Sequence, residues 1–182
     1  PFVRDYAAGR TPNPCLACNR ALKFGLLLDH ALGLGARHLA TGHYARSRCV
    51  AGDWQLLVAA DARKDQSYVL YALGQRELAH LLFPLGELTK AEVRAHARRL
   101  GLPAAERPES QDICFLRDND YRRFVAERAP EALRPGPILS LDGRVLGEHR
   151  GLPYYTVGQR EGLGIAAARP LYVQRLDVAR NA

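Results

Sequence analysis

The sequence predicts an α/β fold followed by a smaller, mainly β segment. Residues 14–33 have the amphipathic pattern of a helix, and a short apolar strand (36–40) and a Gly-containing loop (41–44) follow directly. This order is typical of α/β sheets, in which ligands bind beyond the carboxyl ends of the strands. After residue 120 the pattern changes to short β segments with Gly and Pro turns. We therefore expect two domains, residues 1–120 and residues 121–182.

The composition is that of a globular protein with a basic surface. The 182 residues carry a formal net charge of +7, which favours a polyanionic partner such as nucleic acid. No apolar run approaches the roughly 18 residues that a membrane span requires. Four cysteines without local pairing fit a reducing cytoplasm. The chain contains no Met and opens on Pro1, so we expect an N-terminal portion to precede it.

Residues 11–24 carry the first candidate site. Asn13 as N-cap and Pro14 as the first helical residue predict a helix that starts after a proline-stiffened turn. Cys15 and Cys18 then fall in or just before the first turn, where unpaired N–H groups and the helix dipole favour the thiolate form. We expect both cysteines to be reactive. The helix should end near Gly33 and bury an apolar face made of Ala21, Leu22, Leu26, Leu27, Ala31 and Leu32.

Other uses of this cysteine pair stay open. Two cysteines three residues apart also suit zinc or an iron–sulfur cluster, and a cysteine is often only a small apolar side chain. A four-cysteine zinc site would need a second close pair, whereas Cys49 and Cys114 are far apart. The spacing therefore favours redox or nucleophilic use over metal binding and inert packing.

The loop 41–44, Thr-Gly-His-Tyr, offers a glycine that a nucleotide can approach closely, a polar imidazole and a stacking ring. An ordinary turn at the end of a strand would have the same sequence pattern. Residues 46–59 predict a β-hairpin, with Cys49 in a structural position. The polar loop 61–67 is either a solvated turn or a phosphate- or base-contacting loop. A short helix is expected at 68–73, capped by Ser67 or Asp65.

The clearest helix signal follows residue 88. Thr89 and Glu92 form a capping box, and Gly101 and Pro103 end the helix. We expect Val93, Ala97 and Leu100 to form its buried stripe. The outward face is either solvated or suited to an RNA backbone, through Arg94, Arg98 and Arg99.

The polar loop 106–111 leads to Cys114, which we place at the head of a short apolar strand that can move. A helix is expected at 121–127, capped by Asp118 or Asn119. The turn Asp142-Gly143 then predicts a hairpin of residues 138–141 and 144–147. Further strands are expected at 154–157 and 171–176. The Gly-rich segment 158–165 lacks the strand-to-helix setting of a dinucleotide loop.

Taken together, these segments resemble the tRNA-specific 2-thiouridylase family, ATP-dependent enzymes that place sulfur on the wobble uridine of the anticodon. The matching strings occur in the family's order over nearly the whole chain: GRTPNPCLACNRALKF, ATGHYAR, KDQSYVLY, LGELTKAEVR, SQDICF and GEHRGLPYYTVGQREGLGI. Several such strings together are far more specific than any one of them.

The resemblance implies a partial PP-loop domain (adenine nucleotide alpha-hydrolase-like), followed by a small, mainly β central domain. The family's SGGxDS phosphate loop would lie upstream of Pro1 and its C-terminal barrel beyond residue 182, so this chain alone is expected to be inactive. By the same resemblance, Cys18 is the nucleophile and Cys114 carries the persulfide. Gly42 contacts ATP, and the contacts with tRNA or the target base come from Asn13, Pro14, Cys15, His43, Lys64, Asp65 and Gln66.

The resemblance also implies ATP and Mg²⁺ as cofactors, and tRNA and a sulfur-relay persulfide donor as partners. We expect the protein to be a monomeric, cytoplasmic transferase that forms a transient disulfide. Some members have Asp in place of Cys15, where that carboxylate is a candidate acid/base group. Two alternatives stay open. One is a metal-binding module that uses Cys15, Cys18 and Cys114, with His43 as a further candidate ligand, for zinc or an iron–sulfur cluster. The other is a non-catalytic tRNA-binding fragment.

Overall fold

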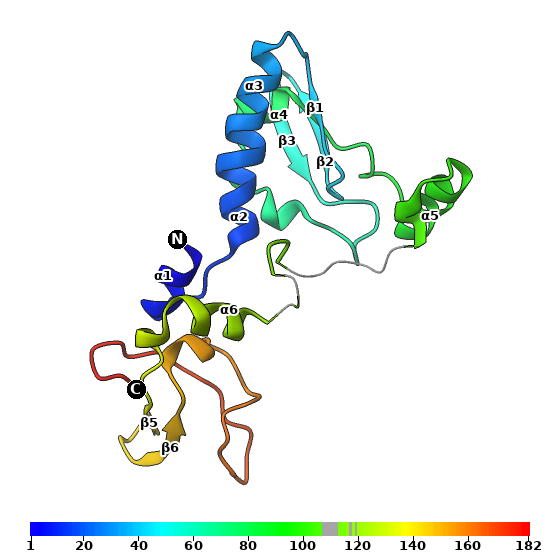
Figure 1. The fold of residues 1–182 in the computed structure, drawn as a ribbon. Coiled ribbons are helices and arrows are strands. Elements are labelled where there is room, and N and C mark those ends of the chain that lie inside the picture. The colour runs from blue at the N-terminus through cyan, green and yellow to red at the C-terminus, as the bar shows by residue number, and fades with distance from the viewer. Residues whose placement is uncertain (107–112, 117, 119) are drawn as a thin grey trace. The chain divides into compact units, whose positions relative to one another are not determined.

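The computed structural model describes residues 1–106, 113–116, 118 and 120–182 (Figure 1). The chain forms two compact units, one of Pro14–Gln111 and one of Pro1–Asn13 with Asp112–Ala182. Helices and short strands alternate in the first unit, and the second contains a β-hairpin, so the α/β expectation is confirmed. The division into domains 1–120 and 121–182 stays a prediction.

One continuous helical segment dominates the first unit. It consists of α2 (Pro14–Cys18), the π-helix η1 (Asn19–Leu27) and α3 (Leu28–Gly33), shown in blue in Figure 1. The helix predicted from Pro14 to Gly33 is therefore confirmed. Its central nine residues have π rather than α geometry, which is uncommon and often occurs at functional sites.

The π turns change which face of this helix is buried. Asn19, Phe24 and Leu28 are the buried residues, whereas Leu22 and Leu26 are 55% and 68% exposed. Leu32 of the predicted apolar face is partly buried against the core, but Leu22, Leu26 and Leu27 are exposed. The prediction failed there because it assumed 3.6 residues per turn, and in a π-helix the hydrogen bonds join residues five apart. Asn19 and Phe24, five apart, consequently face the same way. The core around them contains Phe24, Leu28, Ala45, Val69, Leu70 and Leu81.

Two small sheets accompany this helix. The strand β1 (Leu39–Ala40) pairs in parallel with β4 (Leu81–Leu82), so the strand predicted at 36–40 is shorter than expected. The hairpin predicted at 46–59 is confirmed as β2 (Arg46–Val50) and β3 (Asp53–Leu57), with Cys49 opposite Trp54.

The segment after the polar loop is shorter and tighter than predicted. Only Ser67–Val69 is helical, as the 3-10 helix η2, so the helix expected at 68–73 was wrong. The backbone bonds there join residues three apart, from Leu70 to Ser67 and from Leu73 to Leu70. Gly74, a poor helix former, then begins α4 (Gln75–Ala79) as its N-cap.

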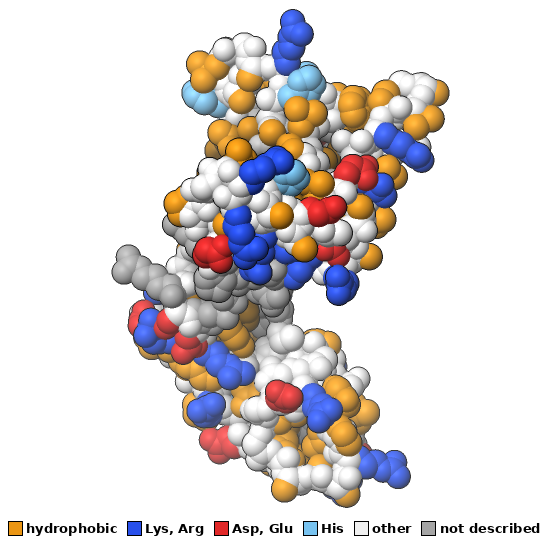
Figure 2. All heavy atoms as spheres, turned by 90° about the vertical axis from the view of Figure 1, so that its right-hand side faces the viewer, with side chains coloured by type: hydrophobic (Ala, Val, Ile, Leu, Met, Phe, Trp, Pro, Cys, Tyr) orange, Lys and Arg blue, Asp and Glu red, His pale blue; other side chains and the backbone are white. Residues whose placement is uncertain are grey.

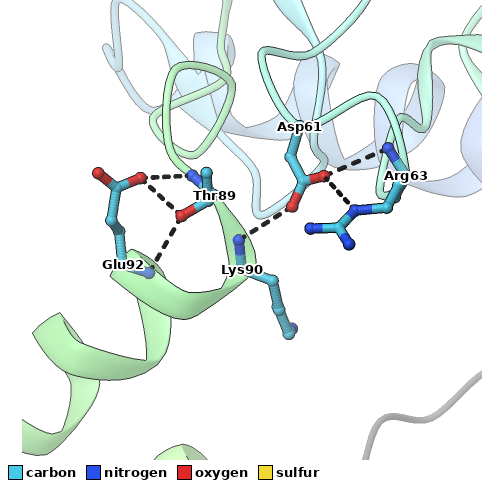
Figure 3. A network of polar contacts seen from close by, with 5 residues as sticks. All are labelled: Asp61, Arg63, Thr89, Lys90 and Glu92. Carbon is cyan, nitrogen blue, oxygen red and sulfur yellow. Dashed lines mark hydrogen bonds and ion pairs between the residues drawn. The ribbon is translucent and has the colours of Figure 1, made fainter.

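The capping box is confirmed at α5 (Lys90–Arg99). The Glu92 N–H donates to Thr89 Oγ1 at 3.3 Å, and the Thr89 N–H donates to Glu92 Oε2 at 2.7 Å (Figure 3). Gly101 ends the helix with a φ of +64°, followed by η3 (Pro103–Glu106). Of the predicted stripe, Val93 and Ala97 are half-buried, whereas Leu100 is 66% exposed. No residue of α5, all of which are described, is fully buried.

The second unit begins with a helix that the sequence analysis did not identify, α1 (Phe2–Ala7). Tyr6 stacks on Tyr121 of α6 (Tyr121–Arg128) with ring centroids 4.9 Å apart. Burial, and then the nearby Tyr121, raise the pKa of Tyr6 to about 12, so this phenol stays neutral. The cap of α6 is Asp120, which accepts the Arg123 N–H at 3.0 Å. The predicted cap at Asp118 was wrong, and Asn119 lies outside the described residues.

The predicted hairpin at 138–147 is confirmed with shifted ends, as β5 (Gly136–Leu139) and β6 (Val145–His149). It follows the short helix η4 (Pro130–Ala132). The strands predicted at 154–157 and 171–176 were wrong. Residues 152–154 form η5 (Leu152–Tyr154), and 171–176 have no strand geometry. Pro153 lies in that 3-10 helix, and positive φ angles at Gly158, Gly162 and Gly164 turn the chain out of extended geometry.

Among the residues that the structure describes, no helix is long and apolar enough to cross a membrane.

Candidate functional site

A cavity of about 430 Å³ opens at the carboxyl end of β1 in the first unit. It lies where α/β sheets place their ligands, beyond the end of a parallel strand. Gly42 and His43, predicted as ATP and tRNA contacts, both line it, as does Gln66. The complete lining consists of Lys23, Leu27, Leu39, Ala40, Thr41, Gly42, His43 and Gln66.

His43 is held as a neutral imidazole. Its Nδ1 lies 3.0 Å from Thr41 Oγ1, and its ring centroid lies 5.7 Å from that of Phe24. Burial, and then the positive charge of Lys23, lower the pKa of His43 from 6.5 to about 4. Near neutral pH this side chain therefore offers hydrogen bonds without a charge.

Gln66 fixes the loop that carries His43. The Gln66 N–H donates to the Tyr44 carbonyl at 2.8 Å, and the Tyr44 N–H donates to Gln66 Oε1 at 3.0 Å. This reciprocal pair joins residues 22 positions apart. The side chain that we predicted to contact tRNA thus also positions the loop beside the cavity.

Asp65 is similarly occupied within the protein. Its carboxylate accepts the Ala59 N–H at 2.8 Å and the Ser67 hydroxyl at 2.7 Å. Burial acts to raise the pKa of Asp65, but the hydrogen bonds from Ser67 and Ala59 outweigh it, so that the pKa is lowered. Lys64, which precedes it, is half-buried, and its N–H donates to the Asp61 carbonyl at 2.9 Å.

Asp61 fastens this loop to α5, as Figure 3 shows. The side chain is only 8% exposed, and it accepts the Arg63 N–H and the Lys90 N–H, each at 3.2 Å. The bond to Lys90 satisfies a backbone group in the first turn of α5. Sequence reasoning missed this role. Only the hydrogen bond from the Arg63 N–H to the Asp61 carboxylate, which forms an Asx turn, can be recognised from the local sequence.

The first pair of cysteines lies on α2. Cys18, the last residue of α2, is half-buried, and Cys15 is exposed. The neighbouring Pro14 begins this helix, whereas Asn13 ends the segment that groups with the second unit. All four cysteines are free, and Cys49 is exposed in β2.

Cys114 lies in a turn of the second unit and not, as predicted, at the head of a strand. The Leu116 N–H donates to the Ile113 carbonyl at 2.9 Å, which closes the turn around the exposed Cys114. Phe115 anchors it, with ring centroids 5.1 Å from Phe2 and 5.5 Å from Phe124. Residues 107–111 of the predicted mobile loop lie outside the described residues. Cys18 and Cys114 therefore belong to different compact units.

Figure 2 shows the face on which α5 lies, and Lys and Arg side chains gather there. Arg98 Nε donates to Glu106 at 2.7 Å, and Arg99 Nη2 lies 2.9 Å from His96 Nδ1. Glu106 thus offsets one of the three arginine charges that we considered for an RNA backbone. The face is a mixed, moderately basic surface.

Protein-bound metal ions such as zinc are usually held by several His, Cys, Asp or Glu side chains. Within the described part of the chain, no three His, Cys, Asp or Glu side chains are grouped so that they could hold one. The cavity at Gly42 has the size and polar groups for part of a nucleotide.

Two family models match the chain almost end to end. Residues 1–118 match the tRNA methyl transferase HUP domain, and residues 122–182 match the tRNA methyl transferase PRC-barrel domain. Both matches are similarities of sequence and give no distances within the site.

Curated relatives match the whole chain. It is 56% identical over 197 residues to a tRNA-specific 2-thiouridylase MnmA of Roseiflexus castenholzii, covering 100% of this chain and 53% of that protein. Proteins of the same name from Symbiobacterium thermophilum and Chloroflexus aggregans are 56% and 57% identical over all of this chain, which covers 47% and 51% of them. The chain thus spans about half the length of the curated relatives it matches.

Proposed function

Because this chain belongs to the tRNA-specific 2-thiouridylase family, we propose that it serves in the ATP-dependent replacement of the C2 oxygen of the tRNA wobble uridine by sulfur. The activity would be that of a tRNA-uridine 2-sulfurtransferase. The observation that carries the proposal is the 56% identity over the entire chain to a relative of that name. The cavity beside Gly42 and His43 supports it, because it gives a nucleotide a place next to the cysteine helix.

ATP is needed because the C2 oxygen of uracil is a poor leaving group. Adenylation lets that oxygen depart as part of AMP. In this proposal Gly42 allows the nucleotide to approach the backbone, and the neutral His43 donates or accepts a hydrogen bond with the nucleotide or the tRNA. Mg²⁺ would screen the phosphates, but we assign it no ligands in this chain and no step.

Sulfur transfer would use Cys114 and Cys18. The terminal sulfur of a Cys114 persulfide attacks C2, and AMP leaves. The Cys18 thiolate then attacks the Cys114 sulfur, which breaks the sulfur–sulfur bond, forms a Cys18–Cys114 disulfide and releases 2-thiouridine. A thiol reductant returns both cysteines to the thiol form. A disulfide requires Cα atoms about 4.4–6.8 Å apart, so Cys18 and Cys114 must lie within that separation when the disulfide forms.

The remaining site residues are proposed as substrate contacts. Asn13, Pro14 and Cys15 would line the pocket for the flipped-out uracil, and Lys64, Asp65 and Gln66 would contact the tRNA around it. The basic surface near α5 supports a tRNA partner. A persulfide donor protein, a cytoplasmic location and a monomeric state complete the proposal.

The test is thiolation of an unmodified tRNA by the full-length protein, read as 2-thiouridine by nucleoside mass spectrometry. Cys18→Ser and Cys114→Ser should each reduce the product to background, since each removes a sulfur that must form a bond. Cys49→Ser is the matched control and should retain activity, because that exposed residue has no proposed role. Retained thiolation in either of the first two variants would refute the assigned roles.

A further inference from the structure

The π-helix brings a lysine into the cavity. Lys23 lies in η1, five residues after Cys18, and it lines the cavity together with Gly42 and His43. Leu27, four residues further along η1, lines the same cavity, so this part of the helix presents Lys23 and Leu27 to it. The helical segment that carries Cys18 at the end of α2 therefore also supplies a lysine to the cavity.

Lys23 brings a positive charge to an otherwise uncharged lining. Of the described residues that line the cavity, Leu27, Leu39 and Ala40 are apolar, and Thr41 and Gln66 are neutral polar groups. Lys23 itself is exposed, and no ion pair with a carboxylate is found for it among the described residues. The cavity thus has an apolar part, neutral hydrogen-bonding groups and one ammonium group.

We propose that Lys23 binds a phosphate group of the nucleotide that occupies this cavity. The inference rests on the proposed function and deepens it, because it identifies the cation that holds the anionic part of the substrate. Lysine binds phosphate as a compact point charge. The apolar lining suits the adenosine part of a nucleotide, whereas an RNA backbone would favour a row of exposed cations. A nucleotide phosphate therefore fits this arrangement better than a tRNA phosphate.

The experiment measures binding and needs no catalytic turnover. Dissociation constants of the full-length protein are measured by calorimetry for a non-hydrolysable ATP analogue, for adenosine and for unmodified tRNA. The variants are Lys23→Met, Lys23→Arg and, as the matched loss of an exposed charge that does not line the cavity, Arg37→Met. Because Lys23 is exposed, Lys23→Met should fold normally, which circular dichroism checks.

Lys23→Met should raise the dissociation constant of the ATP analogue about 10-fold to 100-fold, the usual effect of losing one hydrogen bond to a charged group. Adenosine, which has no phosphate, and tRNA should bind as before. Lys23→Arg should restore part of the affinity, and Arg37→Met should change none of the three constants.

Three results would overturn the inference. These are unchanged binding of the analogue by Lys23→Met, an equal loss for adenosine, and a loss for tRNA alone, which would assign Lys23 to the RNA backbone. If the wild-type protein binds no nucleotide, both this inference and the proposed function fail. If the Lys23 effect holds but the wild-type protein does not thiolate tRNA, only the proposed function fails.

Discussion

The two cysteines with proposed reacting roles are held in very different ways. Cys18 ends α2 in a continuous helical segment of 20 residues (14–33), whose Phe24 is only 2% exposed in the core of its unit. Cys114 lies in a short turn, and its neighbour Phe115, which anchors the turn, is 44% exposed. The first cysteine thus lies on a helix packed into a core, and the second lies exposed in a turn that is held by the half-exposed Phe115 and by Leu116, which is 8% exposed.

This difference matches the chemistry proposed for each residue. A nucleophile gains from a fixed position, because orientation lowers the entropic part of the barrier. A sulfur carrier must meet a donor, the uridine and Cys18 in turn, which an exposed position in a turn permits.

Phe24→Ala should destabilise the first unit by about 3–5 kcal/mol, because it removes a fully buried aromatic ring from the core. The measurement is urea unfolding of this chain, followed by the fluorescence of Trp54, the one Trp of the sequence, which lies in β3 of that unit. Leu22→Ala, at a 55% exposed position of the same helix, is the control and should shift the midpoint little. Equal shifts for the two variants would contradict the observed buried face.

Phe115→Ala should cost only about 1–2 kcal/mol, since the ring is half-exposed and contributes mainly its contacts with Phe2 and Phe124. Circular dichroism should detect this loss, whereas the Trp54 fluorescence transition should stay unchanged, because Phe115 belongs to the other unit. Phe115→Leu, which keeps apolar volume, should recover most of the stability. A large shift of the Trp54 transition would show that the Cys114 turn is not anchored separately.

Gln66→Ala should destabilise the first unit by about 1 kcal/mol, through loss of the hydrogen bond from the Tyr44 N–H to the Gln66 side chain. The Trp54 unfolding assay measures it. Gln66→Glu retains an oxygen acceptor and should be closer to the wild type. If Gln66→Ala matched the wild type, the loop beside His43 would not depend on this bond.

His43 should give the first unit a pH-dependent stability of about 1 kcal/mol after allowance for solvent screening. Its pKa is about 4 in the folded protein and 6.5 without the fold. Between these values the unfolded chain binds more protons, so stability is present above pH 6.5 and is lost as the pH falls towards 4. His43→Gln should remove this part of the pH profile, measured by urea midpoints from pH 7 to pH 4. His38→Gln, at an exposed position, should leave it in place.

Features that depend on near neighbours in the chain follow from residue type and spacing alone. The start of the cysteine helix at Pro14, the capping box at Thr89 and Glu92, and the two hairpins are all confirmed. Each of these depends on interactions within a few residues, which residue type and spacing encode directly. The resemblance to the family could likewise be recognised from short strings of residues that occur in a fixed order.

Which faces these elements bury, and which distant residues meet, depends on packing in three dimensions. The helical segment with the π-helix η1 buries Phe24 and Leu28 in place of most of the predicted face, and Lys23 of η1 lines the cavity. The hydrogen bonds from the Tyr44 N–H to Gln66 and from the Lys90 N–H to Asp61 join positions 22 and 29 residues apart. Local periodicity carries no signal for contacts at such separations, because they form only when whole elements pack together.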